Sequence, residues 1–306
     1  MSLEYRGTTV DVEPPDIGFQ AAFGFYLGLT VGGSVVLAGV LAGATTATLL
    51  GAFPTVVTAV TIAGHLLARR ARGLPERIGR ARRWRFGCYL PAIAFAAAAL
   101  APRVISLEAT SRYYLAAVGF AVVLGVAALG LERLCRNRFV EAVTADEPAA
   151  VWTYRPAGLL ARGVVWFPLA VFVLAGGAAS VAAGSPVGLL WIAIGVLVVA
   201  WIWFDVEGSA RGKKYGGKRY SADTSSASDA QWGELRAHER GIRYDRGRAS
   251  KLVPWESVSG VELIDDELVL QRRFRTLRCD REAIDDPEAA LEAIQRLRAR
   301  ARAAEI

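Results

Sequence analysis

The sequence is poor in the residues that form metal sites, disulfides and most catalytic centres. It contains two histidines and three cysteines in 306 residues, and none of them has a CxxC or HExxH spacing. His65 and His238 lie in different halves of the chain, and an odd number of cysteines argues against a disulfide framework. We therefore expect no metal and no cofactor, and we predict that the protein is not an enzyme.

Charged residues are also scarce over the first two thirds of the chain. Residues 1–206 contain 16 arginines, no lysine and 11 acidic residues, whereas residues 207–306 contain 20 basic and 18 acidic residues. Apolar residues make up 53% of the chain, which excludes a disordered protein. Composition therefore divides the chain into a membrane half and a water-soluble tail.

Apolar runs in the membrane half are long enough to cross the roughly 30 Å hydrocarbon layer, which takes about 20 residues per helix. The run from Ile17 to Leu67 contains no acidic residue and no arginine, and it is too long for one span. We interpret it as two helices that turn near residues 42–44. The predicted six-helix transmembrane domain, 17–206, has approximate spans at 17–41, 46–68, 86–102, 113–131, 163–183 and 187–204.

Arginines are concentrated in two of the segments between these spans. Residues 69–85 contain eight arginines and residues 132–162 contain five, whereas each of the other connections contains two at most. Because basic loops stay in the cytoplasm, six spans with both termini cytoplasmic place both arginine-rich segments on the same side. The sequence therefore predicts a multi-pass protein of the cell membrane with a cytoplasmic N-terminal segment, residues 1–16.

Glycines recur at four-residue spacing in the first predicted span. Gly24, Gly28 and Gly32 form a flat stripe where another helix can approach closely. The stripe could join two copies into a homo-oligomer, or it could receive a neighbouring helix of the same bundle. We favour packing within the bundle.

A linker, 207–230, follows the last predicted span. Its first part is basic, and its second part is rich in serine and cannot form a core. Basic side chains beside a span attract anionic lipid headgroups, and they also help to keep the tail inside. The candidate lipid contacts are Lys213, Lys214 and Lys218.

Residues 231–302 have the pattern of a small folded domain. Short alternating runs separated by glycine and aspartate turns predict an antiparallel sheet or barrel. A helix then begins where Asp286 can cap it and Pro287 suits its first position, with an apolar stripe through Ala290, Ile294 and Leu297. The six predicted strands lie near 234–239, 242–245, 251–253, 258–263, 268–270 and 274–279.

The stretch ERGIRYDRGRASKLVPWESVSGVELIDDELVLQ, with the Gly241-Ile242 turn, the Pro254-Trp255 break and the helix from Asp286, resembles the pleckstrin-homology-like (PH-like) domains of prokaryotic membrane proteins. The resemblance covers about 75 residues. It implies seven strands closed by a C-terminal helix, one strand more than the sequence predicts. It also implies binding of protein segments, other domains or lipid headgroups. The predicted fold class is thus a transmembrane all-α bundle plus a small PH-like barrel capped by one helix.

The densest basic cluster of the tail has two interpretations. It could form a solvated strand face paired with Asp265, Asp266 and Glu267, or it could contact anionic lipid or an acidic partner. Nucleic acid is the weakest option, because the tail has a net charge of only +2 and no aromatic stacking platform. The cluster consists of Arg272, Arg273, Arg275 and Arg278.

Two functions are compatible with this architecture. The first is a non-enzymatic scaffold or sensor, in which the bundle holds a PH-like domain at the membrane and that domain binds a protein partner or a lipid surface. The second is a channel or transporter subunit with a regulatory or oligomerising tail. No ionisable residue lies at the centre of a predicted span, which argues against ion-coupled transport. The candidate pore residues are Thr45, Thr46, Thr48, Thr55, Thr58 and Thr61. Threonine also packs well in spans, and we favour packing as their role.

Overall fold

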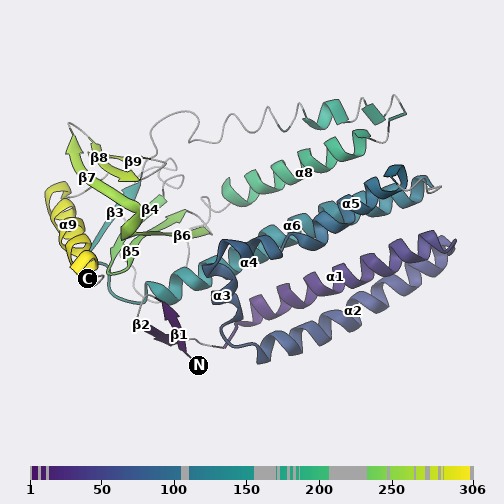
Figure 1. The fold of residues 1–306 in the computed structure, drawn as a ribbon, viewed down its shortest axis with the longest axis horizontal. Coiled ribbons are helices and arrows are strands. Elements are labelled where there is room, and N and C mark those ends of the chain that lie inside the picture. Colours follow the sequence, from purple (N-terminus) through teal and green to yellow (C-terminus); the bar gives the residue numbers. More distant parts are fainter. Residues whose placement is uncertain are drawn as a thin grey trace, which may run out of the picture. The chain divides into compact units, whose positions relative to one another are not determined.

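The computed structural model divides the chain into two compact units (Figure 1). The first unit is Met1–Phe139 with Trp166–Trp201, and the second is Val140–Val165 with Ile202–Ile306. The structure describes residues 2–5, 8–11, 14–104, 110–154, 170, 173–177, 180–181, 184–185, 187–206, 233–246, 249–264, 267–272, 276–281, 284 and 286–303.

The first unit is mostly helical, and α6 and α8 each end in the second unit. A two-stranded antiparallel hairpin, β1 (Ser2–Tyr5) and β2 (Thr8–Asp11), precedes the helices and was not predicted. The helices are α1 (Ile17–Leu41), α2 (Thr46–Arg70), α3 (Leu74–Arg80), α4 (Arg82–Gly87), α5 (Leu90–Val104), α6 (Ser111–Val143) and α8 (Val187–Val206).

Among the described residues, three helices, α1, α2 and α6, are long and apolar enough to cross a membrane. Two shorter apolar stretches, Leu90–Pro102 and Val187–Val199, lie in α5 and α8. The predicted membrane half is therefore confirmed in outline. Most of the predicted span 163–183 lies outside the described residues.

The helix ends differ most from the predicted span ends at two places. Helix α6 continues to Val143, well beyond residue 131, because leucine, arginine and glutamate favour helix after the apolar run has ended. Helix α5 begins at Leu90 rather than at residue 86, and Pro91 lies in its first turn, where the missing N–H costs no hydrogen bond. Hydropathy predicts which residues are apolar enough for the membrane interior, whereas helix propensity and proline positions determine where each helix starts and stops.

The second unit contains two antiparallel sheets and one helix, α9 (Pro287–Ala303). A 3₁₀ turn, Trp255–Ser257, separates the sheets at the predicted Pro254-Trp255 break. The four-stranded sheet has the order β3 (Ala150–Tyr154), β4 (Gly233–His238), β5 (Gly241–Arg246) and β6 (Ala249–Pro254). The three-stranded sheet has the order β7 (Val258–Ile264), β8 (Glu267–Arg272) and β9 (Leu277–Asp280).

Strand β3 was not predicted from the sequence. It lies in the arginine-rich segment 132–162 and pairs with β4, with Trp152 opposite Leu235. The predicted domain limits, 231–302, therefore leave out one strand of the folded unit. A five-residue strand carries little local signal, and its partner follows about 80 residues later in the chain.

Helix α9 starts and packs as predicted. The backbone N–H of Ala289 donates to Asp286 Oδ1 at 2.9 Å, so Asp286 is the cap. Ala290, Ile294 and Leu297 are buried in the same core as Trp152 and residues of both sheets. The helix thus covers the sheets with its apolar stripe.

Candidate functional site

The connection between α6 and β3 is bound to the β4–β5 hairpin of the second unit. Asp146 lies in this connection, and its Oδ2 accepts a hydrogen bond of 2.9 Å from the backbone N–H of Glu239. Its other oxygen, Oδ1, lies 3.3 Å from Nδ1 of His238, within ion-pair distance but without hydrogen-bond alignment. Arg243 Nη1 donates to Thr144 Oγ1 at 3.3 Å. We call the set Thr144, Asp146, His238, Glu239 and Arg243 the hairpin latch.

Burial controls the protonation of His238 in the hairpin latch. The side chain is 3% exposed, and this burial lowers the pKa of His238 below its ordinary value. Asp146 acts in the opposite direction, while Arg243 and Arg236 also lower the pKa. The neutral imidazole is thus the form that the folded unit favours.

The second unit is expected to lose stability as the pH falls below about 6.5, the pKa of an unperturbed histidine. Below that value the unfolded chain binds a proton that buried His238 does not yet bind, so the equilibrium shifts toward unfolding until the lowered folded pKa is reached. Limited proteolysis of the full chain between pH 5 and 8 measures this. In Asp146→Asn the loss of stability should extend to more acidic pH values than in the unmodified protein, because the group that raises the pKa of His238 is gone. A pH-independent cleavage rate in both proteins would contradict the assignment.

A small cavity lies between the 3₁₀ turn and the end of α9. It encloses about 220 Å³ and is lined by Trp255, Glu256, Val258, Ala301 and Arg302. The Trp255 indole N–H donates to the carbonyl oxygens of His238 and Glu239 at 3.1 and 2.9 Å. A residue that lines the cavity is thus hydrogen-bonded to the hairpin latch. A lining that combines apolar side chains with one acidic and one basic residue suits a side chain of a bound peptide.

A polar group lies within the first unit, near the start of α5. The hydroxyl of Tyr89 donates to Glu132 Oε2 at 3.0 Å. Glu132 Oε1 lies 3.7 Å from an Arg85 nitrogen and 3.6 Å from an Arg136 nitrogen. We call Arg85, Tyr89, Glu132 and Arg136 the Glu132 cluster. Glu132 directly follows the predicted span 113–131, but no pattern in the sequence connects these four residues.

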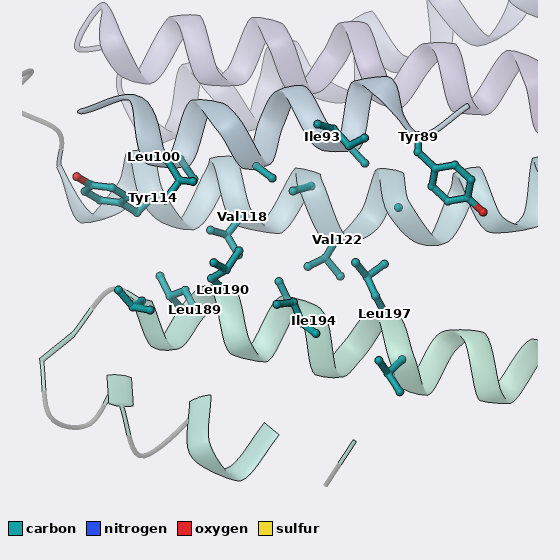
Figure 2. A pocket seen from close by; sticks show the side chains of 18 of the residues that line it. Tyr89, Ile93, Leu100, Tyr114, Val118, Val122, Leu189, Leu190, Ile194 and Leu197 are labelled. Atoms are coloured by element: carbon teal, nitrogen blue, oxygen red, sulfur yellow. The ribbon is translucent and has the colours of Figure 1, made fainter. Parts of the chain in front are cut away.

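An apolar groove adjoins the Glu132 cluster. It lies between α5, α6 and α8, and Figure 2 shows its lining side chains, with Tyr89 and Tyr114 at opposite ends. Its volume is about 570 Å³. Apart from the two tyrosine hydroxyls, its side chains carry no polar group.

Of the predicted basic contacts, only Arg272 and Arg278 belong to the described part of the chain. Arg278 lies 3.3 Å from Glu267, which is one of the acidic partners expected for it. Arg272 is half-buried and makes an interaction of its own. The remaining candidates, Arg273, Arg275, Lys213, Lys214 and Lys218, lie outside the described residues.

The glycine stripe of α1 lies against α2. A Cβ atom on Gly24 would be 2.9 Å from the backbone nitrogen of His65, and one on Gly32 would be 2.6 Å from a methyl group of Val57. A Cβ atom on Gly28 would be 2.7 Å from the carbonyl oxygen of Val57. The stripe therefore receives a neighbouring helix of the same chain.

The threonines of α2 do not share one face. Thr55 and Thr58 are exposed, whereas Thr61 lies against Gly28 of α1. Thr45 caps α2 by accepting from the Thr48 N–H at 3.2 Å. Thr55 donates to the carbonyl oxygen of Gly51 at 3.2 Å. The described contacts of these threonines are capping and packing contacts within the bundle, and they do not place the threonines on one polar face.

Among the described residues, no group of three or more histidine, cysteine, aspartate or glutamate side chains could hold a metal ion. Cys279 is buried in the core of the second unit, and burial raises its pKa to about 12, which makes the thiol unreactive at neutral pH. Comparison with protein-family models, curated proteins and solved structures finds no match to this chain.

Proposed function

We propose that the protein is a non-enzymatic membrane scaffold or sensor whose cytoplasmic PH-like domain binds a protein partner. The transmembrane part is a bundle of six spans, and both termini are cytoplasmic. The two sheets of four and three strands with a C-terminal helix support the resemblance to PH-like domains. Strand β3 supplies the seventh strand that this family pattern requires.

The observation that carries the proposal is the short connection between α6 and the domain. Only six residues, 144–149, separate the end of α6 from β3, and a chain of that length reaches about 25 Å at most. Asp146 shortens this connection further by binding the β4–β5 hairpin. A strand on so short a connection stays close to the end of α6, so the domain is tethered to a membrane helix and its effective concentration for membrane-bound partners is raised.

The charges of the described surface favour a protein partner over a lipid surface. Arg278 is paired with Glu267, and the cavity beside α9 has both an acidic and a basic residue at its rim. A lipid-binding surface would need unpaired basic residues that face anionic headgroups. The cavity at Trp255 and Ala301 is therefore the proposed contact for the partner.

The proposal is tested by purifying the full-length protein from native membranes in mild detergent and identifying co-purifying proteins by mass spectrometry. Ala301→Trp fills the cavity. It is expected to lower the amount of the stoichiometric partner that co-purifies by at least about tenfold. Ala299→Trp is the matched control, because Ala299 is exposed on the same helix and does not line the cavity. A partner that remains equally with both variants, or no partner at all, would overturn the proposal.

A further inference from the structure

The groove between α5, α6 and α8 has the dimensions and lining of a site for a hydrocarbon chain. It lies within the first unit. Along α6 its lining extends from Tyr114 to Leu129, fifteen residues or about 22 Å of helix. Alanine and glycine at Ala92, Ala96 and Gly125 keep the space between the helices open.

One end of the groove carries a positive charge that its own acid does not balance. Tyr89 lines the groove and hydrogen-bonds Glu132, which faces both Arg85 and Arg136. One carboxylate therefore meets two guanidinium groups. The Nε atoms of both arginines are buried and have no hydrogen-bond partner among the described residues. A buried donor without a partner is costly, so this arrangement calls for an anion.

The described residues of the segment 173–181 do not fill the groove. A Cβ atom on Gly195 of α8 would meet Leu174, and one on Gly177 would meet Ile192. Gly195 and Ile192 do not line the groove, whereas Leu190, Ile194 and Leu197 do. The described part of this segment and the groove thus use different faces of α8, so none of its described residues lines the groove.

We propose that the groove binds one anionic phospholipid, with an acyl chain between α5, α6 and α8 and the phosphate at Arg85 and Arg136. Bidentate guanidinium groups match a phosphate well, and the apolar lining matches the chain. The site makes the lipid an integral part of the bundle, because its acyl chain would contact all three helices that line the groove. The inference depends on the membrane placement of the helices and not on the role of the PH-like domain.

Native mass spectrometry of the full-length protein in mild detergent tests the site. The protein is titrated with phosphatidylglycerol or with phosphatidylcholine, which have the same acyl chains and differ in net charge. We expect one phosphatidylglycerol to bind per chain at least about tenfold more tightly than phosphatidylcholine. Arg85→Gln should abolish this preference, whereas Arg83→Gln, an exposed neighbour outside the Glu132 cluster, should retain it.

A second pair of variants tests the groove itself. Ala99→Phe places a ring in the groove and is expected to weaken phosphatidylglycerol binding about tenfold or more. Ala97→Phe on the exposed face of α5 should leave binding unchanged. If Ala99→Phe does not elute as a folded protein, the Arg85→Gln result decides. Equal binding of the two lipids, or unchanged binding in Arg85→Gln, would overturn the proposal.

Discussion

Replacing Trp152 with alanine is expected to unfold the second unit while the helices of the first unit remain folded. Trp152 is 3% exposed and packs in one core with residues of both sheets and α9. Loss of a fully buried tryptophan costs about 3–5 kcal/mol, which is most of the stability of a small domain. Alkylation of Cys279 in the full-length protein, located by peptide mass spectrometry, measures the result. Cys279 is buried and has a pKa of about 12, so it reacts only when the unit opens.

Val151 provides the matched control for this experiment. It precedes Trp152 in β3, but its side chain is 49% exposed because successive residues of a strand point to opposite faces. Val151→Ala should therefore leave Cys279 protected. Equal protection in Trp152→Ala and Val151→Ala would show that β3 is not part of the core.

Replacing Gly28 with leucine is expected to separate α1 from α2 and to lower the thermal stability of the bundle. A side chain at this position would meet Thr61 and the backbone of Val57, and backbone atoms cannot move aside as a flexible side chain can. Overpacking of this kind costs about 1–3 kcal/mol or more. Close approach of small residues is also a main source of helix association in a bilayer. The measurement is the temperature at which the detergent-purified protein loses its monodisperse elution peak.

The control for Gly28→Leu is the same substitution at Gly51 of α2. A Cβ atom on Gly51 would meet nothing within 4 Å, so the added side chain has room. Gly51→Leu should keep the elution temperature of the unmodified protein or raise it, since leucine favours helix over glycine. A similar loss in both variants would indicate that the substitution acts on each helix alone and not on the contact between them.

The glycine stripe illustrates what could be predicted and what could not. The spacing of Gly24, Gly28 and Gly32 predicted a close helix contact, because a periodic stripe of small residues is a local property of one helix. The identity of the partner, α2, depends on which helix packs beside α1. The same limit applies to Thr61: its spacing from Thr55 and Thr58 allowed a shared polar face but favoured a packing role, and only the structure shows that its side chain lies against Gly28.

Strand β3 and the Glu132 cluster illustrate the opposite case. Strand β3 is short and lies in an arginine-rich segment, so neither hydropathy nor alternation distinguished it from a loop between two spans. Glu132, Arg85 and Tyr89 come from different elements, and each alone is typical of a span end. Their contacts had no signal in the sequence.

The sequence by itself determined the division into an apolar helical part and a C-terminal part with strands, the start of α1 and α2, and the capped start of α9. These features depend on hydropathy, side-chain charge and capping, which act over a few neighbouring residues. Only the tertiary structure decided that β3 completes the second unit, that Asp146 binds the β4–β5 hairpin and that one carboxylate meets two arginines beside an apolar groove. Each of these joins residues that are distant in the chain, and the energy of such a contact exists only once folding has brought both partners together.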